Sequence, residues 1–346
     1  MKKITILFSI LGLLLATSCE DFLDVKPTNS ASAETSITNA NDAKVVMNGL
    51  MRRLASADYY GRNFVIYGDA RGGDFAIRSQ GRGLDVLYTF NHSKETNNFG
   101  TFWSHLYNCV LQTNNLLLNI EKIEAAGSGT AALSLIKGQA LTLRAMIYFD
   151  LVRLYGKPYD MDKTSYGVPL IIESLDASAQ PTRASVEQIY VQILKDLADG
   201  ATLLDVTAGR AKAANHGFIN YFGNMALQAK VNLYMENYTA ALAAAEVVTG
   251  STAYTLYTNA NWNSSWATQF GSESILELAM VLNESSLGTG SLGYYLLRLN
   301  KVTGALGWFM ASDYFLARLN QDPTDIRKGR SEERRVGKEC RYRGSP

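Results

Sequence analysis

Apolar residues recur every three or four positions along several stretches of the chain, which places them on one face of an α-helix. The clearest stretch ends at Tyr155 and is followed at once by Gly156 and Pro158. We predict that Gly156 ends this helix in the left-handed conformation and that Pro158 prevents its continuation. Arg144 and Asp150 are expected to be solvated charges on its flanks. The apolar positions are Leu133, Ile136, Ala140, Leu143, Ile147, Leu151 and Leu154.

The same periodicity predicts two helices before this one. The first begins near Asn41 and Asp42, either of which can cap it, and runs to about Leu54. The second covers about residues 99–124 and is joined to the core helix by the short loop AAGSG. Because short connections leave neighbouring helices antiparallel, these two helices are expected to form a hairpin.

Further helices are predicted after the Pro158 loop, in which GVPL has an extended pattern. Ser185 and Gln188 form a capping-box pattern ahead of an apolar helical run. Asn215 is expected to cap a later helix, which turns at Asn237 into a second one ending at Gly250. This pair resembles a tetratricopeptide-type unit, a hairpin that buries its apolar face only against neighbouring units. The sequence therefore predicts a mainly α fold, a stack of helical hairpins.

Two long segments, 57–97 and 259–310, lose the helical period and are rich in Gly and aromatic residues. Long irregular insertions in compact domains are usually functional or disordered, and the aromatic content here favours function. Within the second segment, ILELA predicts one short strand. Trp262 and Trp266 flank it and are expected to pack on it, while Trp103 is expected in the core. A short capped helix, SDYFLARL, follows at 312–319.

The first eighteen residues have the pattern of an export signal, with Lys2 and Lys3 before an apolar run too short to span a bilayer comfortably. Small residues then precede Cys19, which resembles the lipobox of bacterial lipoproteins, and we expect Cys19 to be acylated. The alternative is a secretory leader with an incidental cysteine. The polar residues that follow, up to about residue 40, are expected to form a tether.

Charge argues against a nucleic-acid-binding protein, and the cysteine content argues against a cysteine nucleophile. The chain has 33 Lys and Arg against 32 Asp and Glu, without a basic patch that would attract nucleic acid. Cys109 lies in a helical stripe, so a buried thiol is favoured over a nucleophile. The segment 330–346 is highly charged and aperiodic, and we expect it to be a non-native tail.

Seven ordered segments together resemble the SusD/RagB family. They are SCEDFLDVKP, NANDAKVVMNGL, FWSHLYNCVLQTNNLLLNI, GQALTLRAMIYFDLVRLYGKPY, RASVEQIYVQILKDL, ALQAKVNLYMENYTAALAAAEVV and DPTDIR. The resemblance implies a tetratricopeptide-like helical scaffold with long loop insertions over residues 41–329, incomplete at its C-terminus because family members continue further. It also implies a surface-exposed outer-membrane lipoprotein that binds glycans or other oligomeric nutrients as a lid on a SusC-type TonB-dependent transporter.

Sugar binding needs flat aromatic faces for the C–H faces of pyranose rings and polar groups for their hydroxyls. Both irregular segments supply these residue types, and for each residue the alternative is packing beneath its own loop. The family has no fixed ligand motif that could be transferred by position. Our candidates are Tyr59, Tyr60 and Arg78 from the first segment and Tyr294, Tyr295 and Trp308 from the second.

Two other functions are alternatives to nutrient binding. His92, His105 and His216 lack metal-ligand spacing, and no GxSxG or phosphate-loop motif is present, so we expect neither a metal nor a cofactor. A glycoside hydrolase needs only two carboxylates and stays a remote alternative. The other alternative is a tetratricopeptide-like lipoprotein that assembles proteins without binding sugar.

Overall fold

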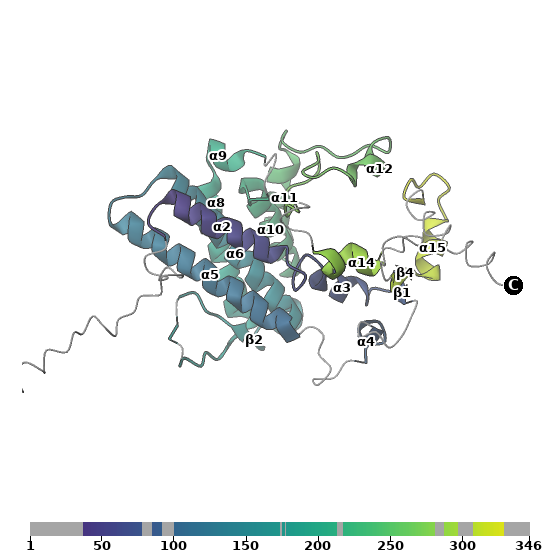
Figure 1. Ribbon diagram of the computed structural model, residues 1–346, viewed down its shortest axis with the longest axis horizontal. Helices are drawn as coiled ribbons and strands as arrows, with labels where there is room; N and C mark the ends of the chain where they lie inside the picture. The colour runs from purple at the N-terminus through teal and green to yellow at the C-terminus, as the bar shows by residue number, and fades with distance from the viewer. Residues whose placement is uncertain are drawn as a thin grey trace, which may run out of the picture. The chain divides into compact units, whose positions relative to one another are not determined.

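A computed structural model describes residues 37–77, 85–91, 100–173, 175–176, 178–212, 217–280, 287–296 and 307–328 (Figure 1). The chain separates into two compact units, Met1–Ile37 and Thr38–Pro346. The described architecture belongs to the second unit, and the predicted lipidation site Cys19 lies outside the described residues. In the part of the chain that is described, no helix combines the length and apolar character needed to cross a membrane.

The described elements are mostly helices, as the sequence predicts. Through the first half they are α2 (Ala40–Leu54), α3 (Asn63–Asp69), β1 (Phe75–Ile77), α4 (Asp85–Tyr88), α5 (Gly100–Ala125), α6 (Ala131–Tyr155), α7 (Tyr159–Asp162), β2 (Tyr166–Pro169) and β3 (Arg183–Ser185). They continue with α8 (Val186–Leu204), α9 (Thr207–Arg210), α10 (Tyr221–Tyr234), α11 (Tyr238–Thr249), α12 (Trp262–Ser265), η2 (Gly288–Gly290), α14 (Leu292–Leu296), β4 (Phe309–Ala311) and α15 (Asp313–Leu319).

Helix α6 is the centre of the helical scaffold. It packs against α5 and α2 on one side and against α8 and α10 on the other, and Figure 1 shows α2 and α5 side by side in front of the other three. Every residue from Ala140 to Val152 is buried, including Leu143 and Ile147 with no exposed surface. The single apolar stripe predicted for this helix therefore understates its burial, because neighbours cover all of its sides along this length.

Arg144 is buried rather than solvated, which corrects the prediction made for it. Its Nε and Nη2 donate to the Asp196 carboxylate of α8 at 2.7 and 2.8 Å, and its Nη1 donates to Asn114 Oδ1 of α5 at 3.0 Å. Buried charges are tolerated when they are paired and fully hydrogen-bonded, and this bidentate pair meets that condition. The guanidinium thus joins three helices of the scaffold.

Helices α6 and α8 approach each other closely through two glycines. A Cβ atom at Gly200 would lie 2.9 Å from Thr142 Oγ1 and 3.0 Å from the Gly138 carbonyl oxygen. Near the same crossing, Asn224 Nδ2 of α10 donates to Thr142 Oγ1 at 2.8 Å and to the Leu197 carbonyl oxygen at 3.0 Å. A side chain at Gly200 would therefore force apart three packed helices.

The helix ends show which capping predictions succeed. The Ser185 and Gln188 capping box is present, as predicted. Helix α2 is capped by Asn39 rather than by Asn41 or Asp42, because the Asn39 side chain accepts from the backbone amides of those two residues, and the helix begins at Ala40. Gly156 is extended (φ −110°) rather than left-handed; a Cβ there would lie 2.8 Å from the Val152 carbonyl oxygen, so close approach explains the glycine.

The predicted hairpin of α10 and α11 is present and turns at Asn237, whose side chain accepts from Ala240 N. Asn220, rather than Asn215, caps α10 by accepting from Gly223 N at 2.8 Å. Asn215 lies outside the described residues. Helix α5 also packs against α6 as predicted for the first hairpin. The fold class expected from the sequence, a mainly α stack of helical hairpins, is confirmed.

The two irregular insertions meet in the structure. Strand β1 from the first pairs antiparallel with β4 from the second, with Ala76 opposite Met310. The predicted ILELA strand is wrong: the described segment 275–279 pairs with no described strand. The Glu277 carboxylate instead turns back to accept from Phe270 N at 2.7 Å and Ser274 Oγ at 2.8 Å. The described parts of the two insertions are thus joined by strand pairing between distant parts of the sequence.

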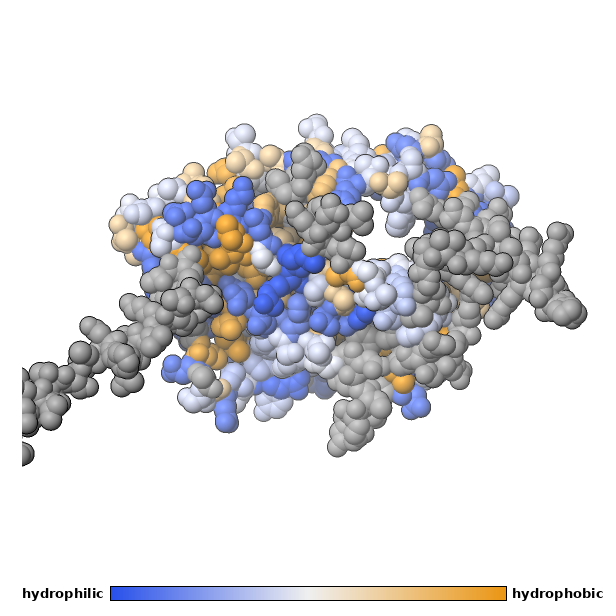
Figure 2. Space-filling view, in the orientation of Figure 1, coloured by the Kyte–Doolittle hydropathy of each residue, from blue (hydrophilic) through white to orange (hydrophobic). Residues whose placement is uncertain are grey.

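Apolar side chains also reach the surface of the scaffold. Figure 2 shows apolar surface over α2 and α5 on the face turned to the viewer. Val45 of α2 is 68% exposed, and Leu111 and Leu118 of α5 are exposed as well. Scattered exposed hydrophobic residues are ordinary, whereas a contiguous group is typical of a surface that contacts a partner.

Candidate functional site

Tyr59 and Tyr60 lie at the start of the first insertion, and both hydroxyls are bound to the scaffold. They donate to Asp150 Oδ2 of α6 at 2.5 and 2.7 Å, and Arg153 pairs with the other carboxylate oxygen, Oδ1. Asp150 is buried, so these three donors compensate a carboxylate that has left water. Burial and the Asp150 charge raise the pKa of both tyrosines well above the ordinary value. This network anchors the first insertion to α6.

The structure contradicts the ligand-binding prediction for Tyr59. Its ring has no exposed surface and packs edge-to-face against the rings of Phe64 and Phe102, at 88° and 72°. It therefore presents no face to a sugar and is a core residue, which is the alternative weighed for every candidate. Tyr60 is half-buried, and its hydroxyl is already engaged by Asp150.

Tyr294, Tyr295 and Trp308, the candidates from the second insertion, lie together. The ring centroids of Tyr295 and Trp308 are 5.0 Å apart at 85°, and those of Tyr294 and Tyr295 are 5.7 Å apart at 79°. All three side chains are half-buried. Such edge-to-face packing holds each ring rigidly while leaving part of it accessible. Arg78, the remaining candidate, lies outside the described residues.

Arg62, from the first insertion, completes this group. Its guanidinium lies 4.9 Å from the centre of the Tyr295 ring, and its Nη1 donates to Tyr295 Oη and to the Gly290 carbonyl oxygen, both at 3.3 Å. We call Arg62, Tyr294, Tyr295 and Trp308 the insertion cluster. Beneath it, Ile66 and Phe309 belong to a small buried core shared by both insertions. Aromatic faces and a guanidinium donor thus come together from segments far apart in the sequence.

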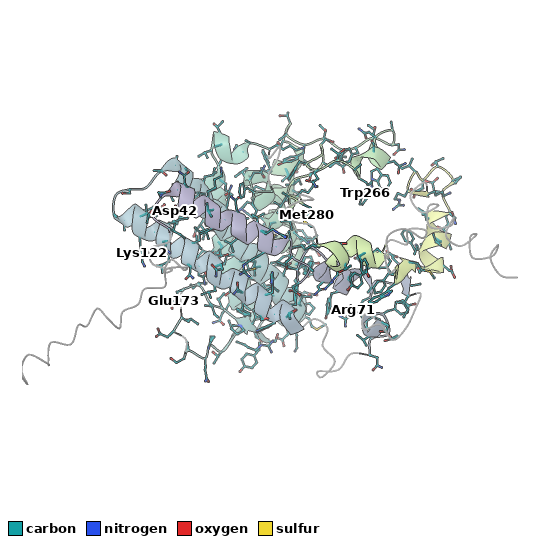
Figure 3. All side chains as sticks on the ribbon, in the orientation of Figure 1. Asp42, Arg71, Lys122, Glu173, Trp266 and Met280 are labelled. Atoms are coloured by element: carbon teal, nitrogen blue, oxygen red, sulfur yellow. The ribbon has the colours of Figure 1, made fainter. Side chains whose placement is uncertain are left out.

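A second group of aromatic residues surrounds a pocket of about 330 Å³ on the segment around α12. The indoles of Trp262 and Trp266 meet at 78° with centroids 5.7 Å apart, and Trp266 is 67% exposed. Figure 3 shows Trp266 on the α12 segment, well apart from Arg71, which is beside α3. We call this the tryptophan pocket; its other lining residues are Tyr257, Ser265, Thr268, Gly271, Glu273, Ser274 and Glu277.

The described residues offer little for catalysis. No group of three or more His, Cys, Asp or Glu side chains in this part of the chain could hold a metal ion. His105 Nε2 lies 3.3 Å from Ser56 Oγ and 3.0 Å from the Arg53 carbonyl oxygen, a structural position between two elements. Cys109 is buried, as predicted, and burial raises its thiol pKa to about 11, which leaves it protonated and unreactive near neutral pH.

Sequence reasoning did not connect Arg62 with the candidate rings or the two tryptophans with a pocket. Arg62 follows a Gly in a segment without helical period, and only the tertiary pairing of the insertions shows its partner. A usable pattern did exist for the pocket. Trp262 and Trp266 are four residues apart, and this spacing places two side chains on one face of a helical turn.

Comparison with known proteins supports the resemblance. Residues 21–215 match a family model described as SusD-like, starch-binding and associating with the outer membrane. A SusD-like protein of Formosa agariphila is 29% identical over 75% of this chain and 48% of its own length. A SusD superfamily crystal structure from Bacteroides thetaiotaomicron is 34% identical, with a TM-score of 0.75 over 84% of this chain and 63% of its own.

A laminarin-binding SusD-like protein has the same fold, with a TM-score of 0.64 over 83% of this chain and 65% of its own, at 22% identity. The chain thus spans about half the length of the Formosa relative and under two thirds of the solved structures compared with it.

Proposed function

The chain belongs to the SusD-like family of carbohydrate-binding proteins, and we propose that it captures oligosaccharides at the cell surface and delivers them to a SusC-type TonB-dependent transporter. The observation that carries the sugar-binding step is the insertion cluster, where three half-buried rings and the Arg62 guanidinium lie together. Aromatic faces suit the C–H faces of pyranoses, and a guanidinium donates to their hydroxyls.

The insertion cluster is held in place before any ligand arrives. Tyr60 binds the first insertion to Asp150 of α6, and the β1–β4 pairing ties the second insertion to the first. A rigid constellation loses little conformational entropy on binding, which favours affinity for a flexible oligosaccharide. We assign Tyr294, Tyr295 and Trp308 as ligand contacts, with Arg62 added and Tyr59 withdrawn; Arg78 stays a candidate.

Anchoring at the outer membrane is the second part of the proposal. The lipobox-like residues before Cys19 support acylation of that cysteine, and the family description includes association with the outer membrane. Acylation would hold the binding unit at the membrane by a tether of about twenty residues. The wild type should incorporate labelled fatty acid and Cys19→Ala should not, and an unlabelled wild type would contradict this part.

The transporter partnership is the third part. The exposed apolar residues Val45, Leu111 and Leu118 on α2 and α5 give the scaffold a surface suited to a protein partner. Crosslinking in intact cells should recover a large TonB-dependent barrel protein. If the neighbouring gene encodes no such transporter and none is recovered, the delivery step is wrong.

Sugar binding itself is tested by electrophoresis through gels that contain laminarin or starch. We expect retardation of the chain relative to gels without polysaccharide, together with no increase in reducing ends after incubation. New reducing ends would support the glycoside hydrolase alternative instead.

The exposed apolar residues Val45, Leu111 and Leu118 also favour a second candidate function. In it, the chain is a helical scaffold that assembles proteins without binding sugar. That candidate predicts recovery of a membrane partner and no retardation on any polysaccharide. The Trp308→Ala variant separates the two, because it should weaken retardation while leaving partner recovery unchanged.

A further inference from the structure

We propose that the tryptophan pocket is a second sugar site, which accepts an uncharged sugar unit and rejects acidic ones. This inference rests on the proposed function, since it assumes that the protein binds glycans. It concerns a different part of the molecule, because none of the residues in the insertion cluster lines the pocket.

The indoles provide the binding surface. Trp266 is 67% exposed, and Trp262 stands at 78° to it, so the two rings form a corner. The exposed indole of Trp266 lines the pocket and presents apolar surface that a protein would normally bury. A pyranose ring can cover one indole with its C–H face while its edge meets the other.

The polar side of the pocket is made by two carboxylates. Glu273 Oε1 accepts from Tyr257 N at 2.6 Å, and Glu277 Oε2 accepts from Phe270 N and Ser274 Oγ. These bonds fix both side chains against the loop. For Glu273 Oε2 and Glu277 Oε1, the described residues provide no hydrogen bond, so these oxygens are able to accept from sugar hydroxyls.

The charge of the pocket sets its selectivity. Neither glutamate forms a salt bridge with any described residue, and the nearby Lys212 ammonium is held by the carbonyl oxygens of Gly271 and Ser272. The two glutamates outweigh the single charge of this ammonium, which lies behind the Gly271 carbonyl, so a uronate or sulfate group would meet a net negative pocket wall. Neutral hydroxyls, in contrast, donate to carboxylates in charge-assisted hydrogen bonds. An uncharged sugar unit fits and an acidic one does not.

The test uses calorimetry on the full chain with laminarihexaose, maltohexaose and trigalacturonic acid. The wild type should bind at least one of the two neutral oligosaccharides, and the tryptophan pocket should add no affinity for trigalacturonic acid. Trp266→Ala should weaken that binding by roughly 3- to 10-fold, the range expected for losing one aromatic contact. Because Trp266 is mostly exposed, the variant should unfold at the same temperature as the wild type. Tyr166→Ala, an exposed aromatic residue on β2, is the matched control and should not change binding.

Selectivity is tested with Glu273→Gln and Glu277→Gln. Each glutamine keeps an acceptor oxygen for the backbone amide and removes the charge, so the loop should stay folded. The double variant should gain measurable binding of trigalacturonic acid. No gain would overturn the electrostatic part of the inference.

The outcomes separate this inference from the proposed function. If the wild type binds none of the three oligosaccharides, both fail. If it binds a neutral one and Trp266→Ala binds equally well, the second site is wrong and sugar binding stands. Binding of trigalacturonic acid by the wild type that Trp266→Ala weakens would overturn the selectivity outright.

Discussion

Removing one side of the buried Arg144–Asp196 pair should be among the most destabilising single changes in the scaffold. Arg144→Met keeps an unbranched apolar stem and removes the charge and all of the hydrogen-bond donors. The Asp196 carboxylate, 1% exposed, would then keep only Gln192 Nε2, at 2.8 Å, among its described donors. The Asn114 side-chain oxygen and the Ile172 carbonyl oxygen would each lose the bond from Nη1 as well.

The magnitude follows from leaving a buried charge uncompensated. Breaking a buried ion pair from one side costs about 3–5 kcal/mol of unfolding free energy. Replacing both members with apolar residues, as in Arg144→Met with Asp196→Leu, should cost less than the sum of the two single changes by about 2 kcal/mol or more, because no unpaired charge remains.

Urea unfolding followed by far-UV circular dichroism measures these costs. The dependence of the unfolding free energy on urea concentration should be the same in all variants. Lys195→Ala is the matched control, because it removes an exposed pair with Asp199 on the same helix α8 and should cost less than about 1 kcal/mol. A cost below about 1 kcal/mol for Arg144→Met, or strict additivity of the two single changes, would refute the reasoning.

Three further changes test the packing and the titration of the scaffold. Ile147→Ala should cost about 2–5 kcal/mol of unfolding free energy by leaving a cavity in the packing around α6. Unchanged stability with lost sugar binding would show instead that α6 belongs to the sugar-binding site. Gly200→Val should cost about 1–3 kcal/mol or more by forcing α8 from α6, whereas a neutral result in a melting experiment would mean that the helices cross less closely. Burial raises the thiol pKa of Cys109 from 9.0 to about 11, so the folded state holds this proton more tightly than the unfolded chain does. The contribution of this thiol to the unfolding free energy is therefore fully present below pH 9 and falls by up to about 2–3 kcal/mol between pH 9 and 11. Urea midpoints across that range should fall less steeply in Cys109→Ala, and parallel curves for the two proteins would contradict the assignment.

Local sequence patterns were sufficient for the helices. The three- and four-residue spacing located α2, α5, α6 and α8 because their buried faces are set by the helix period itself. The capping box at Ser185 was equally visible, since its partners are three residues apart. These features depend on neighbours within one or two helical turns.

Features set by distant partners were not predictable in the same way. The burial of Arg144 depends on Asp196, 52 residues further along the chain, and the burial of Tyr59 depends on Asp150. The meeting of the two insertions depends on the pairing of β1 with β4, which carries no local pattern in either segment. For the same reason, the sequence identified aromatic-rich insertions as the region of interest without showing which rings are packed and which are accessible.

Calorimetric titration of the protein with a panel of neutral oligosaccharides, with reducing ends counted in the same samples, tests the central claim most directly. The account predicts saturable heat with at least one oligosaccharide, weakened in Trp308→Ala, and a constant number of reducing ends. Absence of binding across the panel, or turnover of the bound sugar, would contradict it.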